Sequence, residues 1–140
     1  MTVLVLDASV TVSWCFPDRR SDFTIQVLRE ISNGFAVVPG LWALEVGNAL
    51  VVSERKGYLK AAQLTAFLRD IEELPKQVEH HSPDQALGRT LELARDYKLS
   101  TYDACYLELA ERMGLPLATL DADLKKAAKK AGVALVVSER

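Results

Sequence analysis

The chain has 140 residues, which is enough for one globular domain and not comfortably for two. Hydrophobic residues make up 49% and charged residues 26%, a composition that excludes a disordered tail, a collagen and a disulfide scaffold. The 17 Lys and Arg residues against 19 Asp and Glu residues give a net charge of −2, so the chain is not a generic polycationic nucleic-acid binder. We expect a single domain over residues 1–140.

The cysteines and the amino terminus indicate a reducing, cytoplasmic setting. Cys15 and Cys105 lie far apart in apolar stretches, without the spacing of a zinc or redox site. No uncharged apolar run approaches the roughly 18 residues of a membrane span. The first residues reach Asp7 without a basic region, so they predict a strand rather than a signal peptide. We therefore expect a cytoplasmic protein that is not associated with a membrane.

Strands and helices are expected to alternate along the chain. In its first half the predicted order is a strand at 3–6, a short helix at 9–15, a helix from 21 or 22 that ends at Gly34, a strand at 35–38, a helix at 41–55 closed by Gly57, and a helix around 64–71. In the second half it is a strand at 77–79, a helix from Ser82 to about 96, a helix from 100 or 101 to Gly114, a strand at 117–120, a helix at 123–131 and a strand at 133–137. This alternation favours an α/β fold with a mainly parallel sheet, in which sites gather at the carboxyl ends of the strands.

Four acidic residues stand in stretches with little or no other charge, and they are Asp7, Glu45, Asp103 and Asp121, the last of which is followed by Asp123 and Lys125. Asp7 and Asp121 directly follow predicted strands. Glu45 and Asp103 fall early in predicted helices, on faces whose other residues are mostly apolar. Four elements can thus direct carboxylates to one edge of the sheet.

Clustered carboxylates without basic partners repel one another, and a hard divalent cation such as Mg²⁺ or Mn²⁺ relieves that repulsion. Such a cation polarises a phosphate and acidifies bound water, so the pattern favours metal-assisted phosphodiester hydrolysis. Each acid also has a purely structural interpretation, because Asp can cap a helix or interact with its dipole. Asp123 is interpreted first as a helix-start residue, and the choice between Asp121 and Asp123 as the fourth acid stays open.

Four segments in this order and spacing resemble those of the PIN-domain ribonucleases, and the likeness is strongest to the VapC toxins of type II toxin–antitoxin pairs. They are residues 5–9 (VLDAS), 44–50 (LEVGNAL), 99–104 (LSTYDA) and 117–121 (LATLD). The resemblance covers essentially the whole chain. It implies a three-layer α/β/α sandwich, an acidic site that binds Mg²⁺ or Mn²⁺, and cleavage of RNA.

The resemblance also implies roles for individual residues. Asp7, Glu45, Asp103 and Asp121 would be the catalytic and metal-binding set, with Asp7 and Asp103 as the most direct ligands. The side chains expected to support this set are Ser9, Asn48, Thr119 and Asp123. The family further implies a homodimer and a cognate antitoxin whose peptide tail lies in the acidic groove.

Other polar residues have weaker functional interpretations. Lys125, Lys126 and Lys129 place positive charge soon after Asp121, where an RNA backbone could run, although a solvated helix face explains them as well. The pair Arg19 and Arg20 has the same two interpretations. The adjacent histidines at 80 and 81 are expected to be a surface feature of a loop.

We predict a Mg²⁺- or Mn²⁺-dependent endoribonuclease that acts as a toxin. Two alternatives stay open, namely a PIN-domain nuclease that is not a toxin and a catalytically silent PIN-like scaffold that binds a protein. The complete acidic set favours an enzyme, because a scaffold has no need to keep that repulsion. A phosphatase with an aspartyl nucleophile needs a second Asp where Ser9 stands, which argues against that class.

Overall fold

The computed structural model describes residues 1–138 and has a four-stranded parallel sheet at its centre. The strands, in spatial order, are β3 (Lys76–Glu79), β2 (Gly34–Pro39), β1 (Thr2–Leu6) and β4 (Leu117–Ala118). In the register, Thr2 lies opposite Gly34 and Val5 lies opposite Leu117. The strand order reverses between β1 and β4, and such a reversal is where α/β sheets open a crevice at their carboxyl ends.

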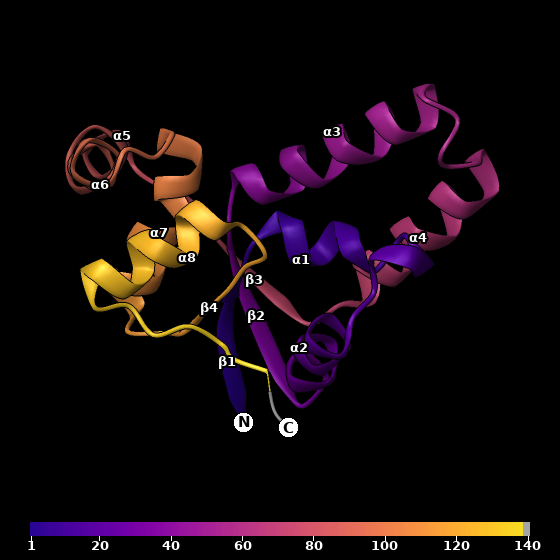
Figure 1. Ribbon diagram of the computed structural model, residues 1–140, viewed down its shortest axis with the longest axis horizontal. Coiled ribbons are helices and arrows are strands. Elements are labelled where there is room, and N and C mark those ends of the chain that lie inside the picture. The colour runs from indigo at the N-terminus through magenta and orange to yellow at the C-terminus, as the bar shows by residue number, and fades with distance from the viewer. Residues whose placement is uncertain (139–140) are drawn as a thin grey trace.

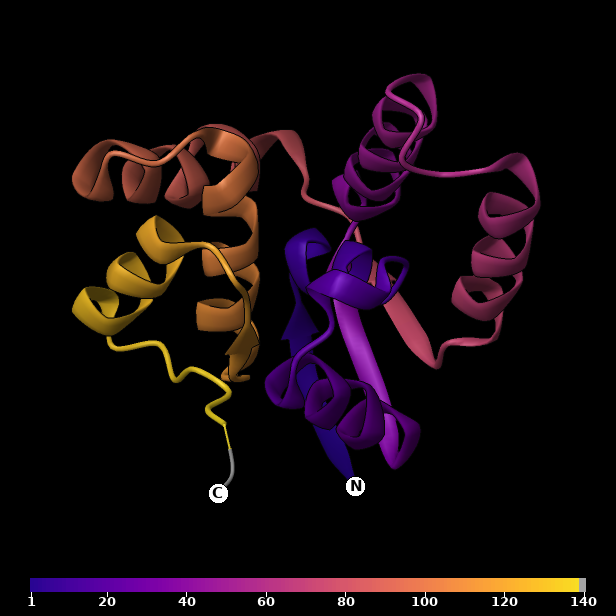
Figure 2. The ribbon, with the colours of Figure 1, turned by 45° about the vertical axis from the view of Figure 1, so that its right-hand side comes forward.

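Helices cover both faces of this sheet (Figures 1 and 2). In chain order they are α1 (Ala8–Ser13), α2 (Asp22–Ser32), α3 (Leu41–Arg55), α4 (Ala61–Glu73), α5 (Pro83–Leu87), α6 (Arg89–Tyr97), α7 (Thr101–Met113) and α8 (Ala122–Ala131). Helix α2 packs on β1 and β2, whereas α7 packs on β1, β2 and β4 from the other side. The arrangement is the expected three-layer α/β/α sandwich.

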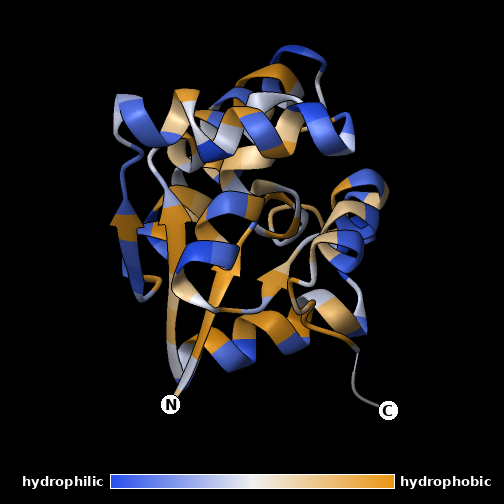
Figure 3. Cartoon of the chain, turned by 90° about the vertical axis from the view of Figure 1, so that its left-hand side faces the viewer, coloured by the Kyte–Doolittle hydropathy of each residue, from blue (hydrophilic) through white to orange (hydrophobic). Residues whose placement is uncertain are grey.

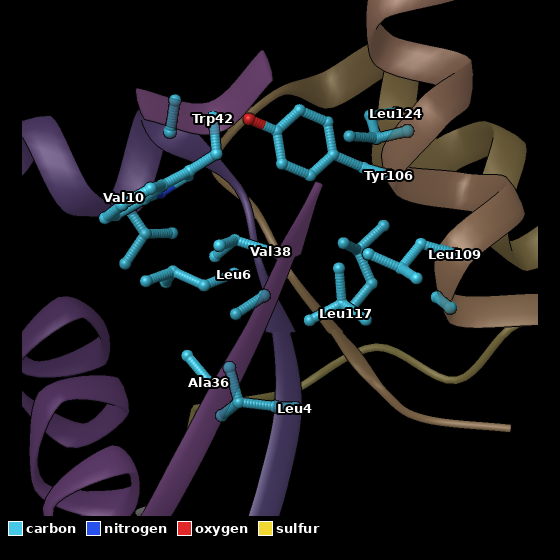
Figure 4. Packing of buried hydrophobic residues seen from close by; sticks show 14 of the residues in the cluster. Leu4, Leu6, Val10, Ala36, Val38, Trp42, Tyr106, Leu109, Leu117 and Leu124 are labelled. Atoms are coloured by element: carbon cyan, nitrogen blue, oxygen red, sulfur yellow. The ribbon is translucent and has the colours of Figure 1, made fainter. Parts of the chain in front are cut away.

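The core lies where these layers meet. Strands β1, β2 and β4 are largely apolar, the edge strand β3 is mostly polar, and the helices alternate between apolar and polar residues along their length (Figure 3). Leu4, Val5 and Leu6 are fully buried, and so are Tyr106 and Leu109 of α7 (Figure 4). Burying a side chain of this size stabilises the fold by about 1.5–3 kcal/mol relative to leaving it exposed. The apolar strand β1 therefore holds Asp7, which follows it directly, in a fixed position.

Most of the predicted elements are confirmed to within a few residues, but the second half of the chain differs in three places. The helix expected from Ser82 to about 96 is two helices, because the chain turns at Gly88 with φ −104° and ψ −105°. The strand expected at 117–120 ends at Ala118. The strand expected at 133–137 is wrong, since in this segment Leu135 makes only a single parallel bridge to Leu117.

The expected role of Gly34 as a helix terminator is also wrong. Helix α2 ends at Ser32, and Gly34 is the first residue of β2. A Cβ atom on Gly34 would overlap the carbonyl oxygen of Thr2 on the neighbouring strand. The glycine is therefore needed for the close approach of the two strands and not for a left-handed turn.

No helix within residues 1–138 is both long enough and apolar enough to cross a membrane.

Candidate active site

A pocket of about 520 Å³ opens at the carboxyl ends of β1 and β4. All four of the isolated acids line it. Asp7 follows β1, Asp121 lies three residues after β4, Glu45 comes from α3, and Asp103 lies in the first turn of α7. The structure thus brings together the four carboxylates that the sequence places at one edge of the sheet.

Asp7 is the most buried of these acids, with 6% of its surface exposed. Its Oδ2 accepts hydrogen bonds from the hydroxyls of Ser9 at 2.6 Å and Thr119 at 2.7 Å. The same two hydroxyl oxygens accept from backbone amides, Ser9 from Leu120 and Thr119 from Asp121, each at 3.0 Å. These bonds connect the end of β1 to the segment after β4 and fix the orientation of the Asp7 carboxylate.

Burial and the charges of neighbouring acids raise the pKa of Asp7, Glu45 and Asp103. Burial raises the pKa of Asp7, the hydrogen bonds from Ser9 and Thr119 lower it, and the charge of Asp121 raises it again. The pKa of Asp103 is raised by burial and then by the charges of Asp121 and Asp7. The carboxylates are therefore close enough to oppose each other's ionisation, and positive charge in the pocket would relieve this cost.

Glu45 is held by a buried tyrosine of α7. The hydroxyl of Tyr106 donates a hydrogen bond of 2.5 Å to Glu45 Oε1, and the Tyr106 ring is fully buried (Figure 4). Burial raises the pKa of Glu45, whereas the Tyr106 hydrogen bond lowers it. Burial and the Glu45 contact raise the pKa of Tyr106, so its hydroxyl stays protonated and remains a donor. Sequence reasoning assigned no role to Tyr106, because its partner Glu45 lies 61 residues away in the chain.

Asp121 and Asp103 also contribute to the starts of their helices. Asp121 is the N-cap of α8, and its Oδ1 accepts from the backbone amide of Asp123 at 2.9 Å. For α7 the cap is Ser100, whose hydroxyl accepts from the Asp103 amide at 3.1 Å. Asp121 therefore both caps the N-terminus of α8 and lines the acidic pocket.

Two of the expected supporting residues, Asn48 and Asp123, and the lysines expected to bind RNA lie outside the acidic pocket. Asn48 is exposed on α3 and is not part of the pocket lining. Asp123 is exposed and lines a neighbouring pocket, which it shares with Lys126. Lys125 is half-buried with its Nζ 6.0 Å from the centre of the Phe23 ring. Lys129 is exposed in the last turn of α8.

The expectation that both histidines are surface features is wrong for His81. Its side chain is 7% exposed, and Nε2 lies 2.9 Å from Glu108 Oε1, without the alignment of a hydrogen bond. Glu108 is itself buried and accepts from Arg112 Nε at 2.9 Å. Neither His81 nor Glu108 lines the acidic pocket. Their contact instead packs the loop that carries His81 against α7.

Arg19 is the only basic residue among the described residues that line the acidic pocket. It ends the short 3-10 turn Pro17–Arg19, and its guanidinium lies 4.3 Å from the centre of the Phe16 ring. Within residues 1–138 no ion pair involves Arg19. Its neighbour Arg20 is engaged differently, because it donates to the Trp14 carbonyl. Arg19 is thus the cation available to an anionic substrate in the pocket.

The donor set fits a hydrated divalent cation. No three His, Cys, Asp or Glu side chains in the described part of the chain already form a closed ligand group. Mg²⁺ does not require one, since it keeps several waters and commonly uses one or two carboxylates. Burial and then the charges of the neighbouring acids raise the pKa of Asp7, Glu45 and Asp103, and a bound cation would favour their ionised forms. The residues present therefore suit such an ion.

Comparisons with known proteins point in the same direction. Residues 4–130 match the model of the PIN domain. The chain is 34% identical over 122 residues to Ribonuclease VapC3 from Pyrobaculum aerophilum, an alignment that covers 86% of this chain and 91% of the relative. It also resembles the crystal structure of PAE2754 from Pyrobaculum aerophilum, with a TM-score of 0.72 and 24% identity over 96% of this chain and 88% of that one. The likeness to PAE2754 shows a shared fold.

Proposed function

Because this chain belongs to the PIN-domain family, we propose that it is a metal-dependent endoribonuclease that acts as the toxin of a toxin–antitoxin pair. The observation that carries the proposal is the gathering of four carboxylates from four separate elements in one open pocket. The pocket lies where the strand order reverses, which is the usual position of a site in this class of sheet. The similarity to a relative named as a ribonuclease supports the same activity.

We assign the metal to Asp7 and Asp103, with Glu45 and Asp121 completing the site directly or through water. A bound Mg²⁺ or Mn²⁺ would supply positive charge to the scissile phosphate and acidify water. Ser9 and Thr119 orient Asp7 through the hydrogen bonds on its Oδ2. Such supporting bonds commonly decide metal affinity, because they fix the geometry of the ligand.

Glu45 is the acid best suited to accept a proton from the attacking water. Burial and the charges of Asp7 and Asp103 raise its pKa, which makes it a stronger base than an exposed glutamate. The hydrogen bond from Tyr106 occupies Oε1 and favours the ionised form of the carboxylate. We assign proton acceptance to the other oxygen, Oε2.

Arg19 is proposed to hold the phosphate of the substrate. A guanidinium forms strong charge-assisted hydrogen bonds to phosphate oxygens. Its stacking on Phe16 orients the side chain at the pocket rim without pairing it to the acids. Arg19 therefore offers RNA a positive charge in a pocket whose other charged residues are acidic.

A protein partner is part of the proposal. Leu44 is 78% exposed and precedes Glu45, and Leu120 is 41% exposed and precedes Asp121. Exposed apolar side chains beside a charged site are suited to being covered by another protein. We propose a cognate antitoxin that covers the acidic pocket with a basic side chain, a homodimeric toxin, and action in the cytoplasm where the RNA is found.

Controlled expression in a bacterial host tests the toxin proposal. The unmodified chain is expected to arrest growth and degrade cellular RNA, whereas Asp7→Ala, expressed to the same level, is expected to do neither. Normal growth with the unmodified chain, despite RNA cleavage by the purified protein, would indicate a nuclease that is not a toxin. Absence of both effects would indicate a scaffold.

A further inference from the structure

A second pocket, of about 390 Å³, lies between the end of α6 and one side of α8, from Asp123 to Lys130. Three lysines line it, Lys98, Lys126 and Lys130. The two helices that carry them are neighbours in both ribbon views (Figures 1 and 2). Lys126 and Lys130 are four residues apart and therefore share one face of α8.

The residues that line this lysine pocket are close in sequence to residues that line the acidic pocket. Lys98 stands five residues before Asp103, and Lys126 stands five residues after Asp121. The helical rise places Lys126 and Lys130 about 8 and about 14 Å beyond Asp121 along α8. Asp123, which lines the lysine pocket, is near enough to Asp103 for its charge to raise the pKa of Asp103. The two pockets thus lie side by side.

The lysines are available to an anion. Within residues 1–138 no ion pair involves Lys98, Lys126 or Lys130. Lys98 also adopts the left-handed conformation, with φ 56°, at the C-cap of α6. Glycine or asparagine is usual at such a position, so a positive charge is present here at a cost in backbone energy.

We propose that the lysine pocket binds the sugar–phosphate backbone of single-stranded RNA next to the cleavage site. The three ammonium groups suit phosphates, and the half-buried ring of Tyr97 offers a surface on which a base can stack. Asp96 and Asp123 also line the pocket, and their carboxylates can accept from ribose hydroxyls. The two carboxylates repel an acidic peptide and a phosphate alike, so the Tyr97 ring, on which an RNA base can stack, is what favours RNA over an acidic peptide. The inference rests on the proposed ribonuclease function.

The lysines involved differ in part from those expected in the sequence. Of Lys125, Lys126 and Lys129, only Lys126 lines the pocket. Lys125 lies over the Phe23 ring instead. The structure adds Lys98, which comes from another helix, and Lys130.

The test compares RNA binding by two triple variants in an Asp7→Asn background, so that the RNA is not cleaved. One variant carries Lys98→Gln, Lys126→Gln and Lys130→Gln. The matched control carries Arg55→Gln, Lys56→Gln and Arg69→Gln, which remove the same charge from exposed positions at the end of α3, at its C-cap and on α4, on the other side of the molecule (Figure 1). Binding of a fluorescent single-stranded RNA is measured by anisotropy over a range of salt concentrations.

Each lost phosphate contact is expected to reduce the slope of log affinity against log salt by about 0.7. The lysine variant should therefore lose about 2 from the slope and bind about a hundredfold more weakly at 0.1 M salt, while the control keeps the parent slope. Tyr97→Leu, which keeps an apolar side chain in place, should weaken binding about tenfold without changing the slope.

A lysine variant with the slope of the parent would overturn the inference. The inference would also be overturned if the lysine variant bound RNA normally and the same three substitutions, made with Asp7 restored, let the toxin escape neutralisation by a co-expressed antitoxin, because the pocket would then be a protein site. Cleavage of RNA by the unmodified chain together with an unchanged slope would reject this pocket and leave the ribonuclease proposal standing. RNA binding that depends on the three lysines, without any cleavage by the unmodified chain, would reject the ribonuclease proposal and leave the RNA-binding pocket standing.

Discussion

The hydroxyl of Thr119 donates a 2.7 Å hydrogen bond to Asp7 Oδ2, across 112 residues of sequence. Thr119 follows β4 and Asp7 follows β1. These two strands are neighbours in the sheet, and the strand order reverses between them. Both residues are almost completely buried. Because β1 and β4 are neighbours, Thr119 is held beside Asp7, and its hydrogen bond fixes the orientation of the most buried acid in the pocket.

Replacing Thr119 tests whether this bond supports the metal site. Thr119→Val keeps the shape of the side chain but removes the donor to Asp7 and the acceptor for the Asp121 amide. We expect affinity for Mn²⁺, measured by calorimetry, to fall about 10–100-fold. Thr119→Ser retains the hydroxyl and should behave like the unmodified protein. Unchanged affinity in the valine variant would mean that Asp7 does not need this support.

Tyr106→Phe is expected to change how RNA cleavage depends on pH. The Tyr106 hydrogen bond favours the ionised form of Glu45 and lowers its pKa, so its loss raises that pKa further above the usual value. If Glu45 acts as a carboxylate, the acidic limb of the pH–rate profile moves to higher pH, and the rates converge at alkaline pH. Tyr102→Phe, on the same helix but exposed, provides the control. Superimposable pH–rate profiles for Tyr106→Phe and the unmodified chain would show that Glu45 does not act as a base in the cleavage reaction.

Arg19→Ala should weaken the use of RNA as a substrate. Loss of charge-assisted hydrogen bonds to a phosphate is expected to lower kcat/KM about tenfold or more, with partial recovery in Arg19→Lys. Arg29→Ala removes an exposed arginine from α2 and should leave kcat/KM unchanged. Steady-state cleavage assays at fixed salt distinguish these cases. Equal kcat/KM for the Arg19 and Arg29 variants would show that Arg19 does not contact the substrate.

Gly34→Ala should destabilise the sheet that holds the site. The new Cβ would overlap the Thr2 carbonyl oxygen and separate β1 from β2, at a cost of about 1–3 kcal/mol. Gly47→Ala is the matched control, because its Cβ would have no neighbour within 4 Å and alanine is favoured in a helix by about 0.5–1 kcal/mol. Urea unfolding measures both. Equal stability of Gly34→Ala and the unmodified chain would contradict the register described for β1 and β2.

Features with a local physical cause could be predicted from the sequence. The aliphatic run at the start of the chain and the isolation of Asp7 indicated a buried strand followed by an acid, and both are found. Gly57 and Gly114, which were expected to close helices, do adopt positive φ angles. The four acids could be grouped because little other charge surrounds them and because carboxyl ends of parallel strands meet at one edge of the sheet.

Features that depend on tertiary contacts could not be predicted. Gly34 has the same local appearance as a helix terminator, and only its approach to Thr2 shows its role. The residues at 133–137 have the composition of a strand, but Leu135 finds only one bridging partner on the short β4. The contact of Tyr106 with Glu45 spans 61 residues, and the presence of Arg19 in the acidic pocket depends on how the turn after α1 folds back.

Cleavage of single-stranded RNA by the purified chain tests the central claim most directly, because it measures whether the gathered carboxylates form a metal-dependent active site. With Mg²⁺ or Mn²⁺ the unmodified protein is expected to cut the RNA and to stop when EDTA is added. Asp7→Asn and Asp103→Asn, each folded by circular dichroism, should be at least about a hundredfold slower. Full cleavage by either variant, or cleavage that persists in EDTA, would contradict the account.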